Sequence, residues 1–251
     1  GYISLALVVI FIILGFSTKK SGWAWAGAFV IFLPVFGHFA LSMFFLAGLG
    51  MLRVSWLPFI DSSINLLDFG NVIYAPYWIL MWIFDQFNYY AKIELAWFFM
   101  ASGAFLFTWG VLIWFRSRFG NQGVATSWIY RISRHPQYLG WIIWTYGLVL
   151  YAPTLNNMKK SWGVSSSLPW LLMTMIIIGI CMLEELKMRK TYGEEYEKYL
   201  NNTPFLFPLP SWLKRIIKFP MWLLIRKKRP EKRREVAGVI TLYTIILIGL
   251  S

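Results

Sequence analysis

Residues 134–140 read Arg134-His135-Pro136-Gln137-Tyr138-Leu139-Gly140 and mark the point where a basic loop gives way to an apolar helix. Pro136 suits the first turn of that helix, because the N–H that proline lacks would have no helical partner there. His135 then stands at the helix start, Tyr138 stands about one turn further on, and Gly140 lets a neighbouring helix approach closely. The stretch therefore predicts a titratable cluster at a helix boundary.

A second polar cluster begins at the pair Glu184-Glu185, directly after an apolar run (168–183). Two carboxylates at the end of a helix are unfavourable, because a helix C-terminus carries partial negative charge. We expect Arg189 to compensate Glu185 across one helical turn, and Glu184 to point elsewhere. The residues that follow predict a short amphipathic helix at 192–200 and then an extended, proline-rich chain to Pro210.

The composition around these clusters is that of a membrane protein. Hydrophobic residues make up 58% of the 251 residues and charged residues only 14%, which is far more apolar than a soluble domain. We predict an all-α polytopic bundle with about seven membrane segments, although several runs are shorter than the roughly 20 residues that span a bilayer. The apolar runs are 2–16, 23–48, 72–84, 93–115, 138–151, 168–183 and 236–250.

The distribution of positive charge predicts the orientation. With seven crossings, residues 49–71, 116–136 and 184–235 fall on one side and carry 19 of the 24 Lys and Arg residues. The positive-inside rule places this side in the cytoplasm. Both polar clusters lie on it, so we expect a cytoplasm-facing site. The net charge of +13 is thus explained by topology and anionic lipids, and we predict no nucleic-acid partner.

The chain divides into three regions by composition. Residues 1–115 are aromatic-rich apolar helix, and His38 within them is expected to hydrogen-bond to a neighbouring helix. Residues 116–210 hold both polar clusters. Residues 211–251 contain an interfacial amphipathic helix (212–225), a basic run (226–234) expected among lipid headgroups, and a last apolar segment. Cys181 is the only cysteine, which excludes an internal disulfide and a cysteine-rich metal site; we predict no metal.

Both clusters resemble the isoprenylcysteine carboxyl methyltransferase family and related membrane phospholipid methyltransferases. The resemblance rests on Arg134-His135-Pro136-Gln137-Tyr138 with Gly140-Trp141, and on Glu184-Glu185 followed by Tyr192-Gly193-Glu194-Glu195-Tyr196, Tyr199 and Thr203-Pro204. It covers about ninety residues, from Gln122 to Pro210. It implies S-adenosyl-L-methionine as the cofactor and a lipophilic, membrane-embedded methyl acceptor, with membrane lipids as surroundings.

The resemblance also implies which residues bind the cofactor. These are His135, Pro136, Gln137, Tyr138, the upstream Tyr130 and Glu184. Gln122, Gly123, Val124 and Ala125 match another cofactor-contacting stretch of the family, although the family's His-Thr pair is replaced here by Gln122-Gly123.

One departure leaves the acceptor open. Relatives that methylate a prenylcysteine carboxylate carry an Arg shortly before the paired acids, whereas residues 177–183 contain none. Because a carboxylate in a dry site needs a cation, either Arg134, Arg131 or Arg189 supplies it or the acceptor is an amine or hydroxyl. Two other functions remain open: an NADPH-dependent reductase of the sterol-reductase type, and a non-catalytic membrane subunit. The oligomeric state is not predicted.

Overall fold

The computed structural model describes residues 2–17, 27, 66–88, 91–119, 124, 126–151 and 167–251. Within these ranges the chain is helical and contains no strand, which confirms the all-α class. The α-helices are α1 (Tyr2–Ser17), α4 (Ala75–Asp85), α5 (Lys92–Phe119), α6 (Pro136–Tyr151), α7 (Ser167–Asn202), α8 (Ser211–Ile225) and α9 (Arg233–Gly249). Two 3-10 helices, η2 (Leu66–Tyr74) and η3 (Trp128–Arg131), precede α4 and α6.

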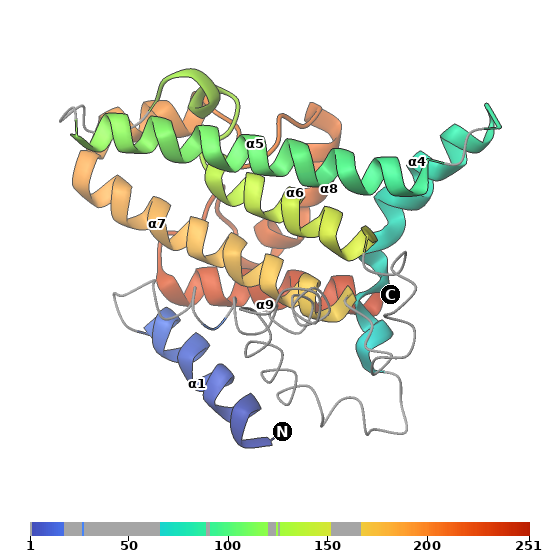
Figure 1. Cartoon of the computed structure of the whole chain (residues 1–251). Helices are drawn as coiled ribbons and strands as arrows, with labels where there is room; N and C mark the ends of the chain where they lie inside the picture. Colours follow the sequence, from blue (N-terminus) through green and yellow to red (C-terminus); the bar gives the residue numbers. More distant parts are fainter. Residues whose placement is uncertain are drawn as a thin grey trace.

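Helices α5 and α6 form a closely packed antiparallel pair (Figure 1). Glycines at facing positions make this possible, because a methyl group on Gly140 would meet the backbone of Phe107 and one on Gly103 would meet the backbone of Trp144. Small residues at such contacts are typical of helix pairs in membranes. The predicted role of Gly140 is therefore confirmed, and the pair fixes where α6 begins.

Helix α7 supplies the centre of the bundle and lies between α6 and α9 (Figure 1). Its inward side chains Met173, Ile177 and Ile180 are fully buried, together with Val149 of α6 and Val236 of α9. Burying a side chain of this size contributes about 1.5–3 kcal/mol. The apolar run 168–183 is thus core as well as a candidate membrane segment.

Gly193 divides α7 into two parts. Its backbone angles, φ 53° and ψ −126°, are not helical, and residues with a side chain rarely adopt a positive φ of this kind. The second part, which runs to Asn202, corresponds to the short helix predicted at 192–200. The turn at Gly193 directs that part back towards the start of α6, where Arg134 N–H donates to the carbonyl of Pro204 (3.0 Å).

Helix α8 ends in a reversal of the chain. Arg226 adopts the left-handed conformation and its N–H donates to the carbonyl of Trp222 (2.7 Å), an arrangement common at helix C-termini. The following residues, 227–232, return to α9. Glu235 in the first turn of α9 accepts the N–H of Glu231 (2.7 Å), so the helix start is capped by a carboxylate.

Two described helices are long and apolar enough to cross a membrane: Lys92–Ser117 and Ser167–Asn202. The sequence predicts about seven membrane segments, which is more than the two described helices that are long enough to cross. Helix α4, in the predicted segment 72–84, has 11 residues and is about 17 Å long, too short for a hydrocarbon core of about 30 Å. The predicted segment 23–48, with His38, lies outside the described residues apart from residue 27.

The end of α1 lies beside the start of α9, because Arg233 Nη1 donates to the carbonyl of Ser17 (3.3 Å). The side of the membrane on which these two helix ends lie stays a prediction.

The residues before α4 lie at the opposite end of the bundle from the polar clusters. Val72 N–H donates to Ser251 Oγ at the end of α9 (3.3 Å), and Gly70 lies against the backbone at the start of α7. Residues 66–72 are therefore remote from Glu184 and Glu185, with which the sequence had grouped 49–71 on one side of the membrane. That side assignment stays a prediction.

Candidate functional site

The first polar cluster is held by its own backbone. η3 leads into Ser133, whose Oγ accepts the N–H of His135 (3.2 Å), and α6 begins at Pro136 as predicted. The carbonyl of His135 accepts the N–H of Leu139 in the first turn of α6 (2.9 Å). His135 is buried, with 7% of its surface exposed. The ring therefore has a fixed position at the helix start.

Glu185 binds both basic side chains of this cluster. Its Oε1 accepts His135 Nε2–H (3.2 Å) and lies 3.1 Å from Arg134 Nε. The Arg134 Nε–H does not point at this oxygen, so the second contact is an ion pair rather than a hydrogen bond. Burial lowers the pKa of Arg134, and the charge of Glu185 opposes this. Glu185 thus neutralises the buried loop.

The predicted pairing of Glu185 with Arg189 is wrong. Arg189 Nε donates to Glu197, in the part of α7 beyond Gly193. Glu185 faces the interior at 8% exposure, where Arg134 also lies. A buried cation such as Arg134 requires a neighbouring carboxylate more than a half-exposed cation such as Arg189 does. Glu185 therefore pairs with Arg134, 51 positions away in the sequence, and not with Arg189 in the same helical turn.

Glu184 points to the other face of α7, as predicted. Tyr138 Oη donates to Glu184 Oε1 over 2.5 Å. This length is typical of a hydrogen bond to a charged acceptor. The contact joins one residue of each polar cluster, and Glu184 remains half-buried, with part of its carboxylate accessible.

Tyr130 connects η3 with α5 and the end of α7. Its Oη donates to the carbonyl of Gly110 (3.4 Å), which also accepts Gln137 Nε2–H (3.2 Å). Its own carbonyl accepts Tyr199 Oη–H (2.6 Å). Burial raises the pKa of Tyr130, and Tyr199 and Glu184 add to the shift. The phenol is therefore neutral and serves as a hydrogen-bond donor.

A cavity of about 1380 Å³, here named the main cavity, opens between these residues. Seven of the ten residues that the family resemblance assigns to the cofactor line it: Val124, Tyr130, His135, Pro136, Gln137, Tyr138 and Glu184. Gln122, Gly123 and Ala125 lie outside the described residues. Arg134 lines the main cavity too, whereas Arg189 lines a different one. The structure thus gathers residues that the sequence separates by up to 60 positions.

Several residues of the main cavity were not predicted. Trp114 and Ser117 come from α5, and Ser117 Oγ is buried without a hydrogen-bond partner among the described residues. Tyr196 and Tyr199, which belong to the motifs of the resemblance but were not assigned to the cofactor, also line the wall. No sequence pattern marks the α5 residues. The two tyrosines could have been predicted from their position in the sequence. They follow Glu184-Glu185 closely, on a helical part that returns to the same cavity.

Further basic residues line the main cavity. They are Lys187 and Lys190 of α7 and the residues Lys232, Arg233 and Arg234 at the start of α9. The wall therefore combines carboxylate, phenol and basic groups. A zwitterionic ligand that also carries an aromatic ring finds complementary groups for each of its parts here.

Comparisons with known proteins give one match. The family model described as "Protein of unknown function (DUF1295)" matches residues 75–203, from α4 to the end of α7 and including both polar clusters. No curated protein and no solved structure matches the chain. Because the matched residues make up just over half of the chain, the protein belongs to the DUF1295 family.

Proposed function

We propose that the protein is an S-adenosyl-L-methionine-dependent methyltransferase that acts on a membrane-embedded acceptor. The observation that carries the proposal is the contact between Tyr138 and Glu184 (2.5 Å) on the wall of the main cavity. The two residues come from the two separate motifs that resemble membrane methyltransferases. If one cofactor site is built from both motifs, the two motifs must come into contact. They do so here, in a cavity lined by the other matching residues.

The chemistry of the wall fits the cofactor. S-adenosyl-L-methionine supplies a methyl group on a sulfonium cation, together with an ammonium, a carboxylate and an adenine. Glu184 is the carboxylate beside Tyr138 that suits the ammonium, and the basic groups that line the cavity suit the carboxylate. Tyr130 and Tyr138 offer aromatic faces for the adenine or the cation. The cavity exceeds the range of about 300–1,000 Å³ usual for small-molecule sites, which leaves room for part of an acceptor.

The residues of the site act by position. Glu185 holds Arg134 and His135, and these fix the start of α6 and hence Tyr138. Alignment and desolvation of two reactants can provide an effective molarity of about 10⁵ M or more. A carboxylate acceptor attacks the sulfonium methyl without losing a proton, whereas an amine or a hydroxyl acceptor must also transfer its proton to a base.

The acceptor is proposed as a lipid or prenylated compound with a carboxylate, amine or hydroxyl group. Of the three arginines considered for orienting it, Arg134 pairs with Glu185 and Arg189 pairs with Glu197, whereas Arg131 lines a different pocket. A carboxylate acceptor would therefore depend on the lysines and arginines that line the main cavity.

The proposal includes a membrane setting. The exposed side of α5 carries large apolar side chains such as Trp97, Phe105 and Leu112, which suit contact with acyl chains. The excess of basic residues near the main cavity supports an orientation in which it faces the cytoplasm.

Calorimetry on the detergent-solubilised full chain tests cofactor binding. We expect S-adenosyl-L-methionine to bind, and Glu184→Gln to weaken binding about tenfold or more, because a hydrogen bond to a charged group contributes about 1.5–3 kcal/mol. Glu194→Gln is the matched control, since Glu194 is exposed and lines neither described pocket. Binding of NADPH in place of S-adenosyl-L-methionine would favour a reductase, and equal effects of the two substitutions would contradict the role of Glu184.

Transfer of labelled methyl groups identifies the acceptor. The full chain is incubated with labelled S-adenosyl-L-methionine and either a total lipid extract or prenylcysteine analogues. Label in the prenylcysteine fraction identifies a carboxylate acceptor, and label in a lipid fraction identifies an amine or hydroxyl. Cofactor binding without transfer to either class would contradict the proposed reaction.

A further inference from the structure

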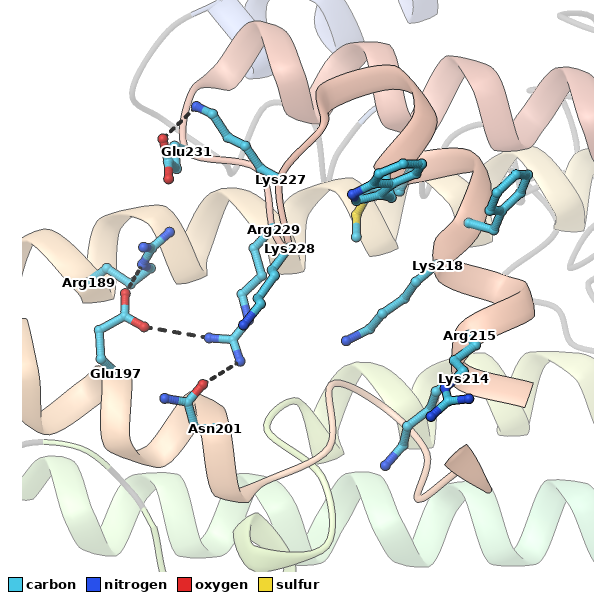
Figure 2. Close-up of a pocket in the computed structure, with 13 residues that line it drawn as sticks. Arg189, Glu197, Asn201, Lys214, Arg215, Lys218, Lys227, Lys228, Arg229 and Glu231 are labelled. Atoms are coloured by element: carbon cyan, nitrogen blue, oxygen red, sulfur yellow. Dashed lines mark hydrogen bonds and ion pairs between the residues drawn. The ribbon is translucent and has the colours of Figure 1, made fainter. Parts of the chain in front are cut away.

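A second cavity, here named the basic pocket, lies away from the residues assigned to the cofactor. It has a volume of about 600 Å³ and is formed by the end of α7, by α8 and by residues 227–231 (Figure 2). Seven of its lining residues are Lys or Arg and two are Glu. The pocket therefore carries an excess of positive charge.

Both carboxylates of the basic pocket are already in ion pairs. Glu197 binds Arg189 and lies 3.6 Å from Arg229, and Glu231 accepts Lys227 Nζ–H over 2.6 Å (Figure 2). Four further cations have no carboxylate within 4 Å among the described residues: Lys214, Arg215, Lys218 and Lys228. The pocket is thus a concave site with uncompensated positive charge.

Some of this charge is held in place. Arg229 Nη2 donates to the carbonyl of Leu200 (2.9 Å) and to Asn201 Oδ1 (3.0 Å). Lys218 points from α8 across the pocket towards Lys228 and Arg229 (Figure 2). Burial lowers the pKa of Lys218, and Arg229 lowers it further. Cations that face one another in this way are stabilised when an anion binds between them.

The basic pocket adjoins an apolar surface. Phe219 and Trp222 line it, and the same helix exposes large apolar residues: Trp212, Ile216, Ile217, Leu223 and Leu224. A helix with apolar and basic groups interleaved in this way lies in the interface of a bilayer, with its apolar side towards the acyl chains. An anion in the pocket could therefore carry acyl chains that extend along α8.

We propose that the basic pocket binds the phosphate group of an anionic phospholipid. Phosphate accepts hydrogen bonds from several lysines and arginines at once, and the adjoining apolar surface gives its acyl chains a place to lie. The pocket is separate from the cofactor residues, so this proposal does not depend on methyl transfer. A soluble phosphate has the same chemistry and is distinguished by experiment.

The test titrates phosphatidic acid, phosphatidylcholine and inorganic phosphate separately into the full chain in neutral-detergent micelles, with calorimetric detection. Because each basic residue near an anionic surface contributes about 1 kcal/mol, Lys214→Gln with Lys218→Gln should weaken phosphatidic acid binding about thirtyfold. The matched control, Lys92→Gln with Lys198→Gln, removes the same charge from exposed positions outside both pockets. It should bind phosphatidic acid like the unchanged protein.

The results of these titrations distinguish a phospholipid from a soluble phosphate. Phosphatidic acid binding that inorganic phosphate does not displace identifies the lipid. Binding of inorganic phosphate that the Lys214 and Lys218 substitutions weaken identifies a soluble phosphate, and this overturns the lipid assignment. Equal losses in the site and control variants, or equal binding of phosphatidylcholine and phosphatidic acid, overturn the proposal. Binding of S-adenosyl-L-methionine, measured on the same variants, should stay unchanged, so a failure of the proposed function is recognised separately.

Discussion

Replacing Glu185 with glutamine should destabilise the protein more than the same change at Glu184. Glu185 neutralises the buried Arg134 and accepts a hydrogen bond from His135 through the same oxygen, and removing one partner of a buried ion pair costs about 3–5 kcal/mol. Glutamine keeps the volume and an acceptor oxygen, so we expect the lower value, about 3 kcal/mol. For a chain of this length that loss lowers the Tm by about 6–12 °C.

Thermal unfolding in detergent, followed by tryptophan fluorescence, measures this effect. Glu184→Gln is the control, because its half-exposed carboxylate keeps a hydrogen-bond acceptor for Tyr138 and should lose about 1 kcal/mol or less. Combining Glu185→Gln with Arg134→Met removes the unpaired cation and should recover part of the lost Tm. If Glu185→Gln and Glu184→Gln unfold at the same temperature, or the double variant recovers nothing, Glu185 does not neutralise the loop.

Three further changes test the packing, the kink and the site. Gly140→Ala should separate α5 from α6 and cost about 2 kcal/mol, whereas Gly249→Ala, which meets no atom within 4 Å, should leave the Tm nearly unchanged. Gly193→Ala should cost about 1–3 kcal/mol through backbone strain alone, since nothing lies within 4 Å of its added methyl group; an unchanged Tm would mean that the kink is not strained. Tyr138→Phe should weaken S-adenosyl-L-methionine binding about tenfold through loss of its contact with Glu184, and calorimetry that finds no loss would remove Tyr138 from the site.

Local sequence signals predicted where the helices of the second half begin. Pro136 marks the start of α6 because a proline is tolerated in the first turn, and Pro210 precedes α8 for the related reason that its fixed φ suits the residue before a helix. The apolar runs at 168–183 and 236–250 were long enough to define α7 and α9. These signals depend on residues that are close together in the sequence, and the helix positions that they predict agree with the structure.

Long-range contacts did not follow from such signals. The rule that residues four apart on a helix can pair suggested Arg189 for Glu185, but it carries no information on which residue is buried. Arg134 is desolvated by the second part of α7, and that packing decided the pairing. The number of crossings does not follow from such signals either, since the length of an apolar run does not show how long the helix in it is, as the 11 residues of α4 illustrate.

The two cavities are connected by one backbone carbonyl. Leu200 O accepts Arg134 Nη1–H (3.4 Å) from the loop of the main cavity and Arg229 Nη2–H (2.9 Å) from the basic pocket. Leu200 itself is buried and belongs to the part of α7 that follows Gly193. This short helical part therefore has one side towards the residues assigned to the cofactor and the other towards the proposed phosphate. Its position is set by hydrogen bonds to Arg134 and Tyr130 on one side and by the ion pairs of Glu197 with Arg189 and Arg229 on the other, which explains why so apolar a chain concentrates its charged residues between Glu184 and Glu235.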